Sequence, residues 1–367
     1  MKRTIEIILG IAMLAILAWL LVPRGALPRV QRNMAAGFQG ALLVASSDGR
    51  LTTLGLFEAP DGGLLAGGVI PRGVQGVASS RDGERAFCWT DRRVYTVARR
   101  QEDLDAPEMW QSEHEILQVI EVHPPSSDAA RLLVLSAEDT SGEQPLGSHL
   151  TLVDPSGAES AREVLLDSAG YNFWRASVGD VDGDGAEDLA LCTWSHTARG
   201  PEMKRRFFVY SWDDQGGLTP RWRGSRLSRP YISAQLAQVL PDERMELVSV
   251  EKGLTGQRLL VAYEWNQFGF WGLGHSEGSD HVVFVGSADV HGDSAPELLA
   301  IVRHEAQPWR VEAFEHTEDA LEPVAQSLPL EVGENVLVIH GAEAPMIVAW
   351  HGRGPLRPRE IAFETAD

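Results

Sequence analysis

Short apolar segments rich in β-forming residues recur along almost the whole chain, and this repetition constrains the fold more than any other feature. β-Branched and aromatic residues dominate the segments, and glycine, proline and aspartate separate them, as in strands joined by turns. No convincing helical periodicity appears after residue 40. Seven such segments, each followed by a second β-rich segment, begin at residues 41, 85, 131, 188, 246, 297 and 345.

Three repeats resemble one another most closely, namely Val209–Ser225, Ala262–Ser279 and Ala313–Ser327. Each contains an aromatic strand, a polar turn and a further short strand. With a final strand leading into the next loop, each repeat holds four strands, which is the signature of a β-propeller. We therefore predict an all-β fold in which residues 41–367 form a seven-bladed β-propeller, preceded by one N-terminal hydrophobic helix. A pair of β-sandwiches without circular closure is the alternative.

The two ends of the repeat array suggest how the ring closes. The last repeat ends with Arg359–Thr365, which we interpret as its third strand. We expect residues 24–40 to be a linker that contains a ring-closing strand over Pro28–Met34. This strand would supply the missing fourth strand of the last blade and protect strand edges that would otherwise be exposed.

The run Gly179–Leu189, with the sequence GDVDGDGAEDL, places aspartates at alternate positions of a tight loop. Ca²⁺ requires six to eight oxygen ligands. Carboxylates at positions 1, 3, 5 and 9 would supply most of them, and they would repel one another without a cation. An acidic, solvated turn is the alternative. The predicted ligands are the side chains of Asp180, Asp182, Asp184 and Asp188, with the carbonyl of Ala186 at position 7.

This loop resembles the calcium loops of FG-GAP and VCBS-type repeats, which form blades in integrin α-chain propellers and in many bacterial surface proteins. The resemblance implies that the loop joins two strands of one blade and enters the apolar strand Asp188–Trp194. It also implies that Ca²⁺ is the cofactor and that its role is structural.

A degenerate copy of the loop lies at Asp289–Glu297, with the sequence DVHGDSAPE. His291 stands in the place of Asp182, and Ser294 in the place of Gly185. Imidazole suits Zn²⁺ or Cu²⁺ better than a hard ion. We expect a metal-free turn here, and a second metal site as the alternative. The ligands of such a site would be Asp289, His291, Asp293 and Glu297.

The N-terminal residues 1–23 contain Lys2 and Arg3 followed by the apolar run Ile7–Val22. This run would span about 24 Å as a helix. We expect an uncleaved signal anchor, or alternatively a cleaved signal peptide. Positive charges lie on both sides of the run and do not decide the orientation. Because Ca²⁺ is scarce in the cytosol, we place the propeller on the periplasmic or exterior side of a bacterial cytoplasmic membrane, or in the secreted fraction.

Two classes of side chain are predicted to serve packing. Cys88 and Cys192 occupy equivalent positions of different repeats, which is too far apart for a disulfide, so we predict two free, buried thiols. Four tryptophans at repeat positions are predicted to pack between blades. They are Trp194, Trp212, Trp222 and Trp265.

The net charge of −20 argues against nucleic-acid binding, because phosphate recognition needs clustered lysine and arginine. Membrane contact is expected through the N-terminal segment only. We therefore predict a binding or scaffolding module for a protein or carbohydrate ligand, and Phe270 and Trp271 are candidate exposed contacts. The alternatives are a propeller-type enzyme with a site at the central channel (a lyase, a glycosidase or a quinone-dependent dehydrogenase) and a structural subunit of an envelope assembly.

Overall fold

The computed structural model describes residues 32–365 except for gaps at 39–40, 48–50, 58–63, 71–72, 81–82, 128, 139–146, 157–161, 164–171, 198–199, 225–226, 332–333, 341–344 and 352–358. Every regular element in these residues is a β-strand, so the fold is all-β. None of them forms a helix with the length and apolar character needed to cross a membrane. The predicted hydrophobic helix over residues 1–23 lies outside the described residues.

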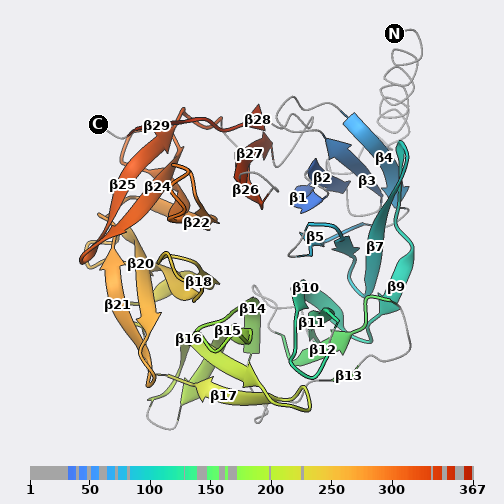
Figure 1. Ribbon diagram of the computed structural model, residues 1–367, viewed down its shortest axis with the longest axis horizontal. Helices are drawn as coiled ribbons and strands as arrows, with labels where there is room; N and C mark the ends of the chain where they lie inside the picture. The colour runs from blue at the N-terminus through green and yellow to red at the C-terminus, as the bar shows by residue number, and fades with distance from the viewer. Residues whose placement is uncertain are drawn as a thin grey trace, which may run out of the picture.

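The strands form antiparallel meanders that follow one another around a central axis (Figure 1). The first strand of each meander lies nearest the axis. The first meander consists of β1 (Arg32–Phe38), β2 (Ala41–Ser47), β3 (Thr52–Phe57) and β4 (Leu64–Ile70). The second consists of β5 (Gly76–Ser79), β6 (Ala86–Trp89), β7 (Arg93–Arg100) and β9 (Glu108–Gln111), with β8 (Asp103–Asp105) between β4 and β7.

The middle of the chain forms three further meanders. The third consists of β10 (Glu115–Val122), β11 (Arg131–Ala137), β12 (His149–Val153) and β13 (Arg162–Glu163). The fourth consists of β14 (Asn172–Gly179), β15 (Asp188–Thr197), β16 (Gly200–Trp212) and β17 (Leu218–Trp222). The fifth consists of β18 (Tyr231–Ala237), β19 (Glu246–Lys252), β20 (Arg258–Trp265) and β21 (Phe270–His275).

The C-terminal part completes the ring. The sixth meander consists of β22 (His281–Ala288), β23 (Glu297–Arg303), β24 (Arg310–Thr317) and β25 (Ala320–Ser327). The last consists of β26 (Glu334–His340), β27 (Pro345–His351) and β28 (Arg359–Glu360), and β29 (Phe363–Thr365) pairs with β25. Single residue pairs, Gly67 with Asp103 and His275 with Ala320, join neighbouring meanders into two nine-stranded sheets.

The pairing at the two ends of the chain differs from the sequence prediction. Residues 28–31 lie outside the described residues, and Arg32–Met34 belong to β1, which pairs with β2 and not with the last meander. A hairpin between adjacent segments closes a much shorter loop than pairing across the whole chain, so it costs less entropy. The predicted single strand over Arg359–Thr365 is divided between β28 and β29, which pair with different strands. β26 still lies beside β1, so the ends of the array meet (Figure 1).

The core lies between successive meanders, which explains why their second strands are apolar on both faces. Alternate residues of a strand point to opposite sides. In β15, Leu189 and Leu191 pack with Leu133 of the third meander. Ala190 and Cys192 point the other way and pack with Leu247 of the fifth. The same strand therefore contributes to two cores.

The packing predictions are confirmed for most of these side chains. Cys88 and Cys192 are free and buried, and burial raises the pKa of both thiols to about 12, so neither is a reactive thiolate. Trp212 and Trp265 are buried, and Trp222 packs against the core between the fourth and fifth meanders. Trp194 is 39% exposed because its pair with Asn172 is the last of the β14–β15 ladder.

Candidate functional site

The loop Asp180–Glu187 connects β14 to β15 and curls around the Asp180 side chain. The backbone N–H groups of Gly183 and Gly185 donate hydrogen bonds to the two carboxylate oxygens of Asp180, over 2.7 and 2.8 Å. Both glycines have a positive φ, 78° and 83°, which costs a glycine little and other residues considerably more. The two glycines noted in the sequence therefore aim backbone donors at Asp180.

Asp188 closes the loop from the first position of β15. Its carboxylate is buried and accepts hydrogen bonds from the N–H of Val181 over 3.3 Å and from the hydroxyl of Ser211 over 2.7 Å. Burial raises the pKa of Asp188 to about 6, partly offset by these hydrogen bonds. The buried position thus disfavours the ionised form unless a cation lies close by.

Three of the predicted ligands converge. One carboxylate oxygen from each of Asp180, Asp182 and Asp188 lies within 4.8 Å of the others. Asp184 is placed differently, because its Oδ1 accepts a hydrogen bond from the N–H of Ala186 over 2.9 Å. The structure therefore brings together positions 1, 3 and 9 of the loop.

Arg221, on β17, supplies a positive charge that the sequence analysis missed. Its guanidinium forms an ion pair with Asp182, and its Nε lies 3.2 Å from Asp188 Oδ1. Its Nη2 lies 3.5 Å from Asp184 Oδ2. Burial lowers the pKa of Arg221, and the Asp180 carboxylate opposes that effect. Nothing in the loop sequence signals this arginine, because the β16–β17 hairpin brings it from outside the motif.

The donor set nevertheless fits a hard cation. Asp182 Oδ1 is buried and has no hydrogen-bond partner among the described residues. A buried oxygen without a partner is costly, and a bound cation would remove that cost. Carboxylate oxygens are the ligands that Ca²⁺ prefers. The Asp180–Asp188 loop therefore carries an oxygen that Arg221 does not satisfy.

The degenerate loop keeps the same backbone cradle. Gly292 and Ser294 donate to the two oxygens of Asp289 over 2.5 and 2.9 Å, with φ of 74° and 71°. His291 Nδ1 lies 2.8 Å from Glu297 Oε1, and Asp293 Oδ1 accepts the N–H of Ala295. The His291 imidazole therefore contacts the carboxylate at position 9. In the first loop, Arg221 from β17 contacts the carboxylate at that position.

A third loop of the same length, Gln238–Met245 followed by Glu246, was missed because it has no aspartate at position 1. Glu246 is buried and accepts hydrogen bonds from the N–H groups of Val239 and Leu240, over 2.8 and 3.3 Å. Arg244 at position 7 pairs with Asp242 over 2.9 Å. The only sequence signal was a carboxylate that opens the next strand, as Asp188 and Glu297 do.

The buried Glu246 makes stability depend on pH. Burial raises the pKa of Glu246 to about 7, whereas an unfolded glutamate titrates near 4.3. The folded state therefore binds the proton more tightly, and ionisation of Glu246 costs stability as pH rises from about 4.3 to about 7. We expect Glu246→Gln to gain melting temperature relative to the native protein between about pH 5 and pH 8, measured in calcium-free buffer. Glu322→Gln, on an exposed residue, is the control, and a pH-independent difference for Glu246→Gln would contradict this account.

A polar hollow of about 650 Å³ adjoins the first loop. Glu264 lines it and lies across the β20–β21 ladder from Trp271, so the two side chains share one face of the sheet. Trp271 is 67% exposed, whereas Phe270 is half-buried against Trp222 and Trp265. The exposed contact predicted at Trp271 thus lies beside a hollow. Its lining consists of Asp182, Arg221, Arg244, Glu264, Trp265, Asn266 and Gln267.

Comparison with known proteins supports the fold alone. No protein-family model matches the chain, and no curated protein matches its sequence. The Dos1 propeller shares 10% identity over 87% of this chain and 75% of its own, with a TM-score of 0.50. Hydrazine synthase of Kuenenia stuttgartiensis shares 11% identity over 77% of this chain and 84% of its own, also with a TM-score of 0.50. The predicted β-propeller fold is confirmed, and the FG-GAP or VCBS type of repeat stays a prediction.

Proposed function

We propose that this protein is a seven-bladed β-propeller that acts as a binding or scaffolding module outside the cytoplasm, with Ca²⁺ in a structural role at the Asp180–Asp188 loop. The observation that carries the proposal is the buried Asp182 Oδ1, which has no hydrogen-bond partner among the described residues and belongs to a side chain that converges with those of Asp180 and Asp188. The Asp180, Asp182 and Asp188 side chains would hold the ion. The ion would neutralise their mutual repulsion.

The hollow next to the loop supports a binding role. Asp182 belongs both to the converging carboxylates and to the wall of the hollow. An ion that binds Asp182 would therefore also fix the position of that part of the wall. The remaining lining offers charged groups and amides, and Trp271 adds an exposed aromatic face beside Glu264. Such a surface suits a polar ligand, either a carbohydrate or a segment of protein.

The location outside the cytoplasm rests on charge and on the N-terminal apolar run. A strongly acidic chain is compatible with a cation-rich environment, and bound Ca²⁺ would stabilise a loop of this kind most where Ca²⁺ is abundant. Ile7–Val22 would direct the chain to the membrane and either anchor it there or be removed.

Calorimetric titration of the full-length protein in detergent with Ca²⁺ tests the proposal. We expect one ion to bind and the melting temperature to rise, as for any ligand that binds only the folded state. Asp182→Asn removes a ligand charge and should weaken binding by at least about tenfold. Asp214→Asn makes the same change at an exposed aspartate of the neighbouring turn and should bind as the native protein does.

The outcomes separate the alternatives clearly. Two bound ions, with the second lost in Asp289→Asn, would extend the proposal to the degenerate loop. No binding, or equal binding by Asp182→Asn and the native protein, would overturn it and leave Arg221 as the permanent counter-ion of the loop.

A further inference from the structure

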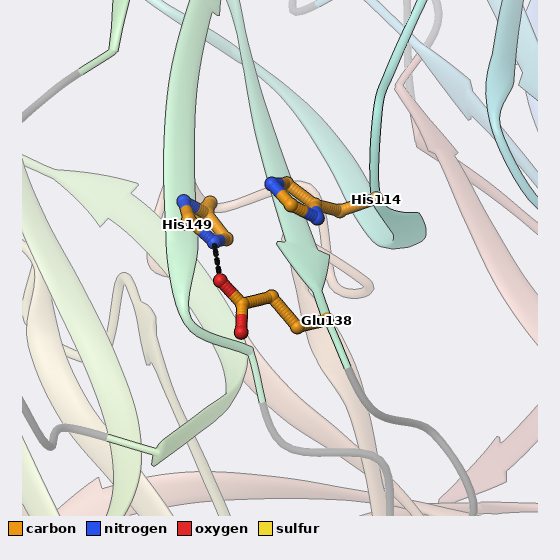
Figure 2. Close-up of side chains that lie close together, drawn as sticks. All are labelled: His114, Glu138 and His149. Atoms are coloured by element: carbon orange, nitrogen blue, oxygen red, sulfur yellow. Dashed lines mark hydrogen bonds and ion pairs between the residues drawn. The ribbon is translucent and has the colours of Figure 1, made fainter.

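A cluster of two histidines and one glutamate lies at one end of the third meander, outside the aspartate loop of the fourth. His114 directly precedes β10, Glu138 directly follows β11, and His149 opens β12 (Figure 2). One ligand atom from each residue, an imidazole nitrogen or a carboxylate oxygen, lies within 4.8 Å of the other two.

The strand register explains why these side chains meet. Glu115 pairs with Ala137, so one step further along the ladder His114 stands across from Glu138. His149 pairs with Ser136, two residues before Glu138. Residues two apart on a strand face the same way, and directly paired residues share a face. The register therefore places all three side chains on one face of the meander.

The backbone around the cluster is held firmly. The N–H of His114 donates to the hydroxyl of the buried Ser112 over 3.0 Å. The N–H of Ser148, next to His149, donates to the carbonyl of Ser136 over 2.9 Å. Gly147 forms two backbone hydrogen bonds with Phe173 of the fourth meander, over 2.6 and 3.2 Å. Such fixed supports reduce the cost of ordering side chains around a ligand.

The side chains themselves are close and partly accessible. The imidazoles of His114 and His149 stack with ring centroids 4.0 Å apart and planes 7° apart. His149 Nε2 lies 3.0 Å from Glu138 Oε1, as the dashed line in Figure 2 marks. The Glu138 side chain is 67% exposed and that of His149 22% exposed, so an ion can enter from solvent.

We propose that His114, Glu138 and His149 form a binding site for a divalent transition-metal ion of the Zn²⁺ type. Two imidazoles and one carboxylate are a donor set that suits Zn²⁺, Ni²⁺ or Cu²⁺ and not Ca²⁺. The nitrogen lone pairs of the two stacked imidazoles lie in parallel ring planes and do not point at one ion. Metal binding therefore requires the His114 ring to rotate, so that a ring nitrogen points toward the ion between it and His149. Three protein ligands leave a further coordination position for water or a ligand atom. The site is independent of the proposed calcium loop and joins β10, β11 and β12.

The test uses the full-length protein in detergent, stripped of metal and then saturated with Ca²⁺ to fill any calcium loop. Co²⁺, which reports its coordination through its visible absorption, is titrated first, and Zn²⁺ is added to displace it. We expect one equivalent of Zn²⁺ to bind and bleach the Co²⁺ spectrum. His114→Ala and His149→Ala should each weaken Zn²⁺ binding by at least about tenfold, and the double variant should abolish it.

The matched control is His304→Ala. His304 Nε2 lies 3.1 Å from Glu312 Oε1, a contact like that of His149 with Glu138, but no described residue stacks a second imidazole on His304. This variant should bind Zn²⁺ as the native protein does. Melting curves without metal check folding, and His149→Gln replaces His149→Ala if the alanine variant is unstable. Absence of Zn²⁺ binding by the native protein, or equal binding by the double variant, would overturn the proposal and leave a stacked pair with an ion pair only.

Discussion

In calcium-free buffer, we expect the Arg221→Gln protein to lose about 2–3 kcal/mol of unfolding free energy. Arg221 contacts Asp182, Asp184 and Asp188, and the Asp188 carboxylate is buried. Removal of one partner from a buried ion pair costs about 3–5 kcal/mol, and from an exposed pair under about 1 kcal/mol. Because Asp184 is half-exposed and Asp188 is not, the loss should lie between these limits. Urea unfolding of both proteins measures it.

Calcium should largely reverse this loss. Without the guanidinium, Asp182, Asp184 and Asp188 lose their ion pairs with Arg221, so Ca²⁺ no longer competes with that charge. We expect the calcium affinity of Arg221→Gln to exceed that of the native protein by about tenfold or more, measured by calorimetry. The difference in unfolding free energy between the two proteins should then shrink in saturating Ca²⁺.

Arg100→Gln is the control for the loss of one positive charge. Arg100 forms an exposed ion pair with Asp105 over 3.4 Å in the second meander, whereas the Asp180–Asp188 loop belongs to the fourth. The Arg100→Gln substitution should change neither the unfolding free energy nor the calcium affinity appreciably. A loss for Arg221→Gln that is the same with and without Ca²⁺, together with unchanged affinity, would mean that Arg221 and the ion do not share the loop.

Phe208→Ala should destabilise the protein by about 3–5 kcal/mol, the range for removing a large side chain from a tightly packed core. Phe208 lies on β16, is fully buried, and packs with Leu133 and Leu152 of the preceding meander. The cavity would therefore open at the contact between two sheets and not within one. Urea unfolding gives the magnitude.

Trp271→Ala is the control for Phe208→Ala, since it removes an even larger side chain from a mostly exposed position. We expect a change within about 0.5 kcal/mol. If both variants lose the same unfolding free energy, the packing of Phe208 between the third and fourth meanders does not stabilise the protein as proposed.

Most of the repeat pattern could be predicted because each strand is a short, continuous segment that can be recognised from its own residue types. The apolar segments beginning at residues 131, 188, 246 and 297 are the starts of β11, β15, β19 and β23. Both faces of these strands are buried, so they contain few polar residues and are visible in the sequence. The ends of the array were harder to predict, because the pairing of Arg32–Met34 depends on which edge is free and not on composition.

The candidate calcium loop was predictable for the same reason, since its ligands and its glycines lie within one short motif. Asp180, Asp182 and Asp188 do converge. Arg221 and the His114–Glu138–His149 cluster were not predictable, because residues of separate strands form them. Spacing along the chain carries no information on such contacts when the register of the strands is unknown.

The sequence by itself determined the all-β repeat and the curled aspartate loop, since each depends on neighbours along the chain. It also indicated the two buried thiols, because each lies in an apolar strand segment. The tertiary structure alone decided which charges meet. The β16–β17 hairpin brings Arg221 to the carboxylates, and the β10–β11–β12 register brings two imidazoles to Glu138. The physical reason is that electrostatic and metal-ligand interactions act over a few ångströms in space, whatever the separation along the chain.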